Sequence, residues 1–288
     1  MSGPFISIVM PAFRCRDTIA ESVQSAIKQT YARWELVISI DDGEDYELLL
    51  ADAGLKDQRI RFTQTGGVGT GSSNARNVGV AAAQSDFIAV LDADDLFIPE
   101  KLELIAPLLA THPLVSTGLQ ITDANLVPLR QVGTKGVQRE LGADIYKFIN
   151  ISMDSMITYN RSRLPIAYDV NQPCLVDMDL IFKAFCHTAK CLHIPAPLHL
   201  YRKQAVSISN GPAAADKFAH MKRTLLSRLE TNHYDFVDPD AARKSFETFL
   251  RASLKTELAF AAQSAKSSSF LFEDLLEAHL KKERIFER

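Results

Sequence analysis

Short apolar runs alternate with amphipathic segments over the N-terminal part of the chain. Strands are predicted at residues 6–10, 34–40, 59–65 and 87–91, and the short apolar run at 87–91 is expected to be buried in a parallel sheet. The segments between them are predicted to be helices at residues 18–29, 44–53 and 73–83. Repeated β–α units of this length predict an α/β fold with a right-handed, doubly wound, mostly parallel sheet. Pro99 then begins a helix expected to run to about residue 111.

Beyond Pro113 the pattern changes to shorter elements. A hairpin over residues 114–132, short strands at 155–159 and 198–202, and a helix over 176–187 are predicted there. From residue 213 onward only helical stripes follow. One of them runs from Phe246 to Leu258, and a serine run at 267–269 is expected to separate the last two helices. The expected organisation is an α/β domain over residues 1–212, divided near residue 98, and a helical C-terminal extension over residues 213–288.

The composition narrows the class of protein. A chain of 288 residues with 47 % hydrophobic and 23 % charged residues is typical of a globular protein. The net charge of −3 gives no electrostatic reason to bind nucleic acid or an anionic membrane, and no apolar run is long enough to cross a bilayer. The N-terminus lacks the basic region of a signal peptide. The four cysteines show no metal-type spacing, so reduced thiols and a cytoplasmic location are expected.

Three carboxylates follow the strand predicted at residues 87–91. In an open α/β sheet, ligands gather at the carboxyl ends of strands, where Asp92, Asp94 and Asp95 are expected to lie. Asp92 and Asp94 are two positions apart, so their side chains can point to one ligand. Two hard oxygen donors suit Mg²⁺ or Mn²⁺ and, through the metal, a phosphate. The alternative is an acidic turn that caps the next helix.

Seven segments stand in a specific order and spacing along the chain, at residues 7–13, 29–37, 41–43, 75–79, 91–95, 99–102 and 201–202. Together they resemble the inverting glycosyltransferases of family 2, which have the GT-A fold. The resemblance covers about residues 5–210 and implies a nucleotide-binding half over 1–98 and an acceptor-binding half over 99–212. It implies a metal-dependent enzyme that moves a sugar from a nucleotide-sugar donor, with a UDP-sugar favoured, to a hydroxyl acceptor.

The resemblance also assigns the acids after the fourth predicted strand. Asp94 is expected to bind the metal directly, and Asp92 to face the ribose hydroxyls or a metal-bound water. Asp95 is expected either to touch the acceptor or to cap the following turn.

The nucleoside pocket is expected beside the first two strands. Either Asp41 or Asp42 would accept a hydrogen bond from the base, unless both belong to an Asp-Gly turn. Pro11, Ala12 and Phe13 would form the wall of the same pocket.

A glycine-rich loop at residues 66–71 precedes the helix that carries Arg76. We interpret the loop as a flexible edge of the donor site, where the backbone can approach phosphate. Arg76 is then expected to contact the nucleotide or to orient Asp42, and the alternative is a surface arginine.

Inversion at the anomeric carbon needs a general base. In the family this is an acid near the start of a helix, which places Asp177 at the base position and Asp179 at a second acid that can contact the acceptor. Val176 stands where relatives have another acid. The alternative for Asp177 is a first-turn acid that complements the helix dipole.

The segment 199–209 resembles the family loop that covers the donor diphosphate. Arg202 and Lys203 are expected to contact the leaving diphosphate. Gln204 stands where many relatives have a metal-binding histidine, and His199 could replace that ligand or be structural.

The acceptor is expected to be a glycan or a lipid-linked glycan of bacterial polysaccharide synthesis, which leaves a peripheral location at the inner face of the membrane open. The C-terminal helices are predicted to pack on the catalytic domain or to form a homodimer, because their charges are mixed rather than basic. Two other functions stay open. One is a non-catalytic nucleotide-sugar-binding scaffold, and the other is a sugar nucleotidyltransferase, which would usually have a glycine-rich basic loop after its first strand.

Overall fold

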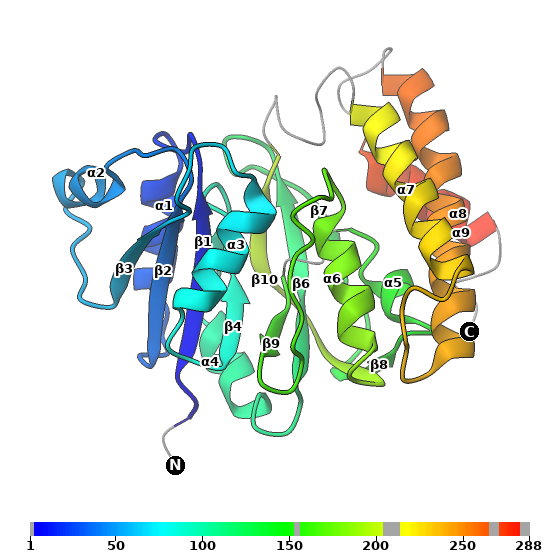
Figure 1. The fold of residues 1–288 in the computed structure, drawn as a ribbon, viewed down its shortest axis with the longest axis horizontal. Coiled ribbons are helices and arrows are strands. Elements are labelled where there is room, and N and C mark those ends of the chain that lie inside the picture. Colours follow the sequence, from blue (N-terminus) through cyan, green and yellow to red (C-terminus); the bar gives the residue numbers. More distant parts are fainter. Residues whose placement is uncertain (1–2, 153–155, 204–213, 265–270, 283–288) are drawn as a thin grey trace.

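The computed structural model describes residues 3–152, 156–203, 214–264 and 271–282. A single sheet runs through its centre, with helices on both faces and a group of C-terminal helices beyond one end (Figure 1). The strands are β1 (Ile6–Ala12), β2 (Trp34–Ile40), β3 (Ile60–Gln64), β4 (Phe87–Val90), β5 (Leu96–Phe97), β6 (Leu114–Thr122), β7 (Pro128–Val132), β8 (Arg139–Gly142), β9 (Thr158–Asn160) and β10 (Lys190–Arg202). The helices are α1 (Ile19–Ile27), α2 (Tyr46–Asp52), α3 (Ser72–Ala82), α4 (Lys101–Ile105), a 3₁₀ turn (Ala106–Leu108), α5 (Tyr146–Ile149), α6 (Val176–Phe185), α7 (Ala214–Glu230), α8 (Pro239–Ser264) and α9 (Phe272–Lys282).

The sheet has ten strands and is mixed. Its order is β3-β2-β1-β4-β9-β6-β10-β5, with β7 beside β6 and β8 beside β10. The first four strands pair in parallel, as does β6 with β10. Strand β9 is antiparallel to both β4 and β6, and it joins the two parallel parts. The predicted α/β class is confirmed. Each antiparallel pair of the sheet includes β6, β9 or β10.

Two hydrophobic cores lie on opposite faces of the sheet. Successive residues of β1 point to opposite faces, so Ile8 enters one core and Val9 the other. The first core also contains α1 and α4, and the second lies under α3 and α6 (Figure 1). Buried residues of α7, α8 and α9 belong to that second core. The C-terminal helices therefore pack on the α/β part, which is one of the two arrangements predicted for them.

The N-terminal elements lie where the apolar pattern predicts them, while three short elements and half of β10 were not predicted. Strand β5 and helix α5 are too short to give a periodic signal, and β8 has little apolar character. Proline is unfavourable within a sheet, and β10 accommodates Pro195 and Pro197 where its register against β6 shifts. On α8, Leu258 is 58 % exposed and lies outside the core. The expected break at 267–269 lies outside the described residues.

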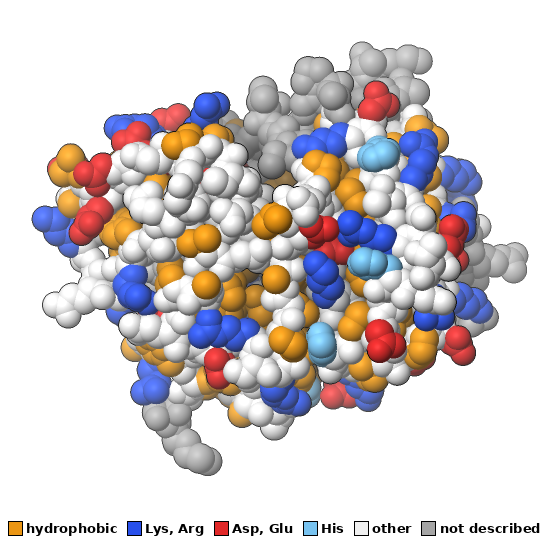
Figure 2. Space-filling model, viewed as in Figure 1, with side chains coloured by type: hydrophobic (Ala, Val, Ile, Leu, Met, Phe, Trp, Pro, Cys, Tyr) orange, Lys and Arg blue, Asp and Glu red, His pale blue; other side chains and the backbone are white. Residues whose placement is uncertain are grey.

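The surface facing the viewer in Figure 2 carries interspersed acidic and basic side chains rather than a continuous patch of one sign. Among the described residues, no helix has both the length and the apolar character to span a bilayer.

Candidate active site

The carboxyl ends of β1, β2 and β4 meet at one edge of the sheet. In the register, Ala12 of β1 lies beside Ile40 of β2, and Val9 of β1 lies beside Val90 of β4. Phe13, Asp41 and Asp92 lie at or just beyond these strand ends. The parallel topology therefore brings together predicted nucleotide-binding residues that are far apart in the sequence.

Asp41 holds the glycine-rich loop. Its side chain is 2 % exposed. One carboxylate oxygen accepts hydrogen bonds from the Thr65 hydroxyl at 2.7 Å and from the Thr70 hydroxyl and amide at 2.5 and 3.0 Å, and the other accepts from the Gly71 amide at 2.9 Å. Burial would raise the pKa of Asp41, but these hydrogen bonds lower it below its ordinary value. With 2 % exposure, Asp41 offers almost no surface to a base, so Asp42 is the better of the two predicted alternatives.

The loop reaches Asp41 because its glycines adopt backbone angles that other residues avoid. Gly69 has φ of 68° and donates its amide to the Asp41 carbonyl at 2.7 Å, and Gly71 has φ of 102° immediately before α3. The loop is thus fastened to the end of β2, and the expected flexible edge is a bonded turn in this structure.

Asp42 faces a cavity of about 410 Å³ instead. Its carboxylate accepts from the Arg14 amide at 2.5 Å, the Tyr46 hydroxyl at 2.8 Å and the Glu44 amide at 3.1 Å, and it remains half-buried. Each carboxylate oxygen can accept two hydrogen bonds, so one acceptor position of Asp42 stays free of these three donors. Asp42 is the better candidate to read a nucleobase.

Phe13 precedes Arg14, one of the residues that line this cavity. Phe13 is 43 % exposed, and its ring lies against the position that a side chain at Gly69 would take. The Arg14 guanidinium is 5.0 Å from the centre of the Phe13 ring. Ala12 is fully buried and Pro11 is half-buried, so among the three predicted wall residues Phe13 offers most of the surface for a flat ligand.

Arg76 is buried and pairs with Asp92. Its guanidinium donates to the Asp92 carboxylate at 2.6 Å and lies 5.3 Å from the ring of Tyr168. Burial works against the charge of Arg76, but Asp92 and, more weakly, Asp177 raise the pKa of its guanidinium above the ordinary value. Arg76 is thus neither a surface residue nor a partner of Asp42, which corrects that part of the prediction. Its Nε is buried and has no hydrogen-bond partner in the structure.

Asp94 differs from Asp92 and Asp95 in its lack of side-chain partners among the described residues. No described side chain forms an ion pair or hydrogen bond with its carboxylate. Burial raises the pKa of Asp94 to about 7, and the carboxylates of Asp95 and Asp92 add to this shift. A bound cation would offset the repulsion between these neighbouring carboxylates. No set of three or more His, Cys, Asp or Glu side chains suited to a metal occurs in the described residues.

Asp95 is fully buried behind Asp94. It accepts from the backbone amide of Arg202 and from Nε2 of His199, both at 2.9 Å. Nδ1 of His199 lies 3.2 Å from the amine of Lys101. Since Asp95 has no exposed surface, it is not an acceptor contact here, and its role is to join β4 to β10. Both nitrogens of His199 have structural partners, so the structural interpretation of this histidine holds.

The two basic residues at the end of β10 point in different directions. Arg202 is buried and forms an ion pair with Glu21 of α1, close enough to Asp94 to lower the pKa of that acid. Lys203 instead forms an ion pair with Glu273 of α9 at 3.0 Å. Arg202 thus remains beside the acids, whereas the Lys203 amine is engaged by a C-terminal helix. The rest of the predicted covering loop, with Gln204, lies outside the described residues.

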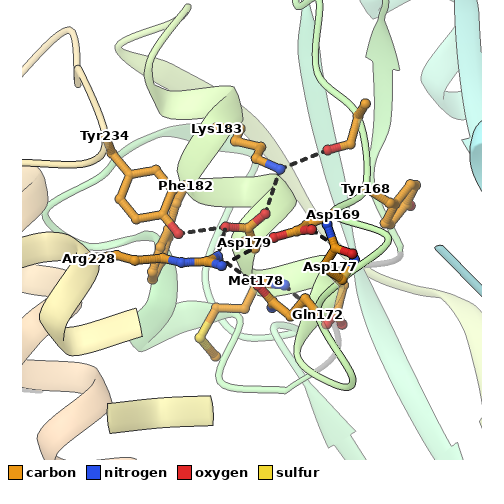
Figure 3. A network of polar contacts seen from close by, with 12 residues as sticks. Tyr168, Asp169, Gln172, Asp177, Met178, Asp179, Phe182, Lys183, Arg228 and Tyr234 are labelled. Atoms are coloured by element: carbon orange, nitrogen blue, oxygen red, sulfur yellow. Dashed lines mark hydrogen bonds and ion pairs between the residues drawn. The ribbon is translucent and has the colours of Figure 1, made fainter. Parts of the chain in front are cut away.

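The predicted base and its neighbour have different environments on α6. Asp177 is half-buried in the first turn, and its carboxylate accepts from the Met178 amide at 3.0 Å. Asp179 is fully buried and binds Lys183, Arg228 and Tyr234 (Figure 3). Asp179 therefore does not reach an acceptor in this structure, which corrects that assignment.

Some residues of the site carry no signal in the sequence. Tyr168, Arg14, Tyr46, Arg228 and Tyr234 all contact predicted site residues. They lie in loops or on helix faces whose patterns are those of ordinary globular structure. An acid at the end of a strand is visible in the sequence, but its tertiary partner is not.

The fold and these strand-end acids define the class of nucleotide-sugar-dependent transferases with a GT-A-type sheet. Residues 7–164, more than half of the chain, match the family model described as glycosyl transferase family 2. The chain therefore belongs to glycosyl transferase family 2, as its motifs predict.

Relatives and a solved structure agree with this class. The chain is 38 % identical over 107 residues to the UDP-Glc:alpha-D-GlcNAc-diphosphoundecaprenol beta-1,3-glucosyltransferase WfgD of Escherichia coli, which covers 36 % of this chain and 40 % of that protein. It is 34 % identical over 97 residues to the enzyme of the same description named WfaP, covering 34 % and 38 % of the two chains. The matches thus span less than half the length of these relatives. The crystal structure of residues 1–349 of S. aureus TarS in complex with UDP-GlcNAc has a TM-score of 0.71 at 17 % identity, over 98 % of this chain and 82 % of that one, and it confirms the fold.

Proposed function

We propose that this protein is an inverting glycosyltransferase that moves a sugar from a UDP-sugar to a hydroxyl of a lipid-linked glycan. The single observation that supports it best is the position of Arg76. The buried guanidinium bonds Asp92 at the proposed donor edge, the carboxyl ends of β1, β2 and β4, and the negative charge of Asp177 adds to the rise in the pKa of Arg76. One buried positive charge is therefore bonded to a strand-end acid and also feels the charge of the candidate base.

The donor is proposed to enter at the cavity beside Asp42. The free acceptor position of the Asp42 carboxylate suits the imide N–H of uracil, and the exposed ring of Phe13 suits stacking of the base. Two relatives are named for UDP-glucose, and the TarS structure contains UDP-GlcNAc. These names favour a UDP-hexose over other nucleotide sugars.

The reaction needs one proton transfer and one substitution. Asp177 takes the proton of the acceptor hydroxyl while the hydroxyl oxygen bonds to the anomeric carbon. The bond from that carbon to the diphosphate oxygen breaks on the opposite face, and UDP leaves with the electron pair. Arg202 lies beside the acids, where its charge favours the leaving diphosphate. Arg76 keeps Asp92 in place throughout.

The residues at the end of β4 fit a divalent cation. Asp94 lacks a cationic partner, its pKa is raised to about 7 by burial and neighbouring acids, and Asp92 has one oxygen free of Arg76. One or two carboxylates together with substrate phosphates are a usual ligand set for Mg²⁺. When bound by Asp94 and Asp92, Mn²⁺ or Mg²⁺ would supply Lewis-acid neutralisation of the diphosphate.

The acceptor is inferred from the relatives alone. WfgD and WfaP are named for a GlcNAc-diphosphoundecaprenol acceptor. We propose an acceptor of the same chemical class, a sugar on a polyprenyl diphosphate, and with it an enzyme that works at the cytoplasmic surface of the membrane.

A binding screen followed by a turnover assay tests the proposal. Thermal shifts are measured with UDP-, GDP-, dTDP- and CMP-sugars, each with and without Mn²⁺. We expect stabilisation by UDP-sugars that requires Mn²⁺, and slow release of UDP from the donor that is preferred. Asp94→Ala should abolish the Mn²⁺-dependent part of UDP binding in calorimetry. Equal UDP affinity in mutant and wild type would exclude Asp94 as a ligand, and preference for another base would exclude the donor class.

A further inference from the structure

We propose that two residues of the C-terminal helical region, Arg228 of α7 and Tyr234 in the α7–α8 connection, are positioning residues for Asp177. The inference rests on the proposed function, since it requires Asp177 to be the base. Figure 3 shows both side chains directed at the N-terminal turns of α6, although they follow this helix by some fifty positions in the sequence.

Arg228 ties the helix to the loop that precedes it. Its guanidinium donates to Asp179 at 3.1 Å, to the side-chain oxygen of Gln172 at 2.9 Å and to Asp169 at 3.1 Å. Asp179 lies in α6, two positions after Asp177, whereas Gln172 and Asp169 belong to the loop. A planar guanidinium that bonds three partners fixes their relative positions, which a flexible lysine does less well.

Gln172 extends this contact to the beginning of the helix. Its amide donates to the carbonyls of Cys174 at 3.0 Å and Leu175 at 2.8 Å. Leu175 precedes the first residue of α6 and has φ of 55°, a backbone conformation that a leucine rarely adopts. The strained turn that sets the direction of the Asp177 backbone is thus held through Gln172 by Arg228.

Tyr234 fixes the same helix from another side. Its hydroxyl donates to Asp179 at 2.5 Å, and burial together with the negative charge of Asp179 raises the pKa of the Tyr234 phenol, so it remains a donor. Lys183 pairs with the other oxygen of Asp179 at 2.7 Å. A buried carboxylate with two hydrogen-bond donors and an ion pair holds one orientation of the helix, including the turn that carries Asp177.

The far end of the loop is attached to the donor side. The backbone of Tyr168 exchanges two hydrogen bonds with the Asn77 side chain of α3, at 2.9 and 3.0 Å, and its ring lies by Arg76. The loop is therefore anchored next to the donor residue Arg76 at one end and to α7 at the other. This arrangement sets the distance between Asp177 and the donor edge.

Packing alone would hold α6 against the C-terminal helices. Phe182 stacks on Phe246 of α8 with ring centres 4.3 Å apart, and Phe236 packs on both. Buried polar networks are often replaceable by apolar packing without loss of stability, so their value lies in fixing geometry. The polar network around Asp179 is thus better explained as a means to orient the first turn of α6 than as a means to attach α6 to the C-terminal helices.

The test separates positioning from stability. We compare Arg228→Gln, Tyr234→Phe and the control Arg251→Gln, which breaks an exposed ion pair with Glu230 elsewhere in the C-terminal helices. Turnover is measured as release of UDP from UDP-glucose with Mn²⁺, where water replaces the acceptor, and UDP affinity is measured by calorimetry. We expect turnover to fall about 10- to 100-fold in Arg228→Gln and roughly 3- to 10-fold in Tyr234→Phe, with UDP affinity unchanged. Arg251→Gln should behave as wild type.

Two further measurements decide between the explanations. In an Asp177→Asn background, Arg228→Gln should cause no additional loss of turnover, because its effect passes through Asp177. Hydrogen exchange of the backbone amides at residues 176–180 should be faster in both variants, while exchange in β1 and β2 stays unchanged. An equal loss in the Asp177→Asn background, or unchanged turnover in Arg228→Gln and Tyr234→Phe, overturns the positioning role and leaves the proposed function standing. Full turnover of Asp177→Asn alone overturns the base assignment and this inference with it.

Discussion

The proposed donor edge and the proposed base, Asp177, are held in place by different means. At the donor edge, Asp41 is bonded by residues 24 to 30 positions away that follow the neighbouring strand. The carboxylate of Asp92 is paired with Arg76, 16 positions earlier. On the base side, Asp179 is bonded by Arg228 and Tyr234, 49 and 55 positions later, from outside the α/β part.

This difference separates what the fold provides from what the C-terminal helices add. The parallel strands β1, β2 and β4 bring their end residues together in every protein with this topology. The orientation of α6, by contrast, depends on helices that the family model, which ends at residue 164, does not include. The arrangement of the strand ends therefore follows from the sheet topology, whereas α6 is held by contacts with the C-terminal helices.

The largest expected effect is at the base. Asp177→Asn should reduce turnover by about 10²- to 10⁴-fold while leaving UDP affinity nearly unchanged, because the amide cannot take the proton. Asp216→Asn is the matched control, since it removes an exposed first-turn acid from α7. If Asp216→Asn lowered turnover as much as Asp177→Asn, the effect would belong to helix stability and not to catalysis.

The second prediction distinguishes the two adjacent acids of the donor edge. Asp41→Ala removes the acceptor of four hydrogen bonds and should lower the free energy of unfolding by about 3 kcal/mol in urea titrations. Asp42→Ala should cost about 1 kcal/mol but weaken UDP binding roughly 10-fold. The reverse order of the two stability losses would mean that the loop is not held by Asp41.

The third prediction concerns pH in the absence of metal. The pKa of Asp94 is raised from 3.8 to about 7 by burial and neighbouring acids, so ionisation of this group opposes folding. Below about pH 4 the carboxyl is protonated in both the folded and the unfolded chain. As the pH rises from there through about 7, the unfolded chain ionises first, and the folded protein loses stability. Asp94→Asn should therefore be more stable than wild type at pH 8, by on the order of 2 kcal/mol, and similar to it at pH 4.

Thermal unfolding in EDTA across this pH range measures the difference. Added Mn²⁺ should stabilise the wild type at pH 8 and have little effect on Asp94→Asn. A stability difference that is constant from pH 4 to pH 8 would contradict the raised pKa.

The smallest expected effect concerns Lys203. Its amine is paired with Glu273 on α9, so Lys203→Met should change stability by no more than about 1 kcal/mol and leave UDP affinity unaltered. Arg202→Met, which removes the charge beside the acids, should weaken UDP binding. Calorimetry on the two variants tests this, and equal losses of affinity would show that Lys203 leaves Glu273 when the nucleotide binds.

The sequence predicts the donor edge well for a physical reason. A buried strand followed by acids is visible as a local pattern, and the parallel arrangement places such ends together without further information. It did not separate Asp41 from Asp42, because which of two adjacent acids turns inward depends on the threonines and amides of a distant loop. For the same reason, Asp95 and Asp179 looked like candidate contacts although both are buried in the fold.

The attachment of α6 to α7 has a practical consequence for recombining relatives. A chimera joined between residues 203 and 214 would keep every donor-edge strand and α6 itself, yet it would replace Arg228 and Tyr234 with residues of another chain. The helix with Asp177 would then rest on a foreign partner. A junction beyond residue 238 instead keeps α6 together with Arg228 and Tyr234, so α8 and α9 can be exchanged between such enzymes without replacing these two contacts.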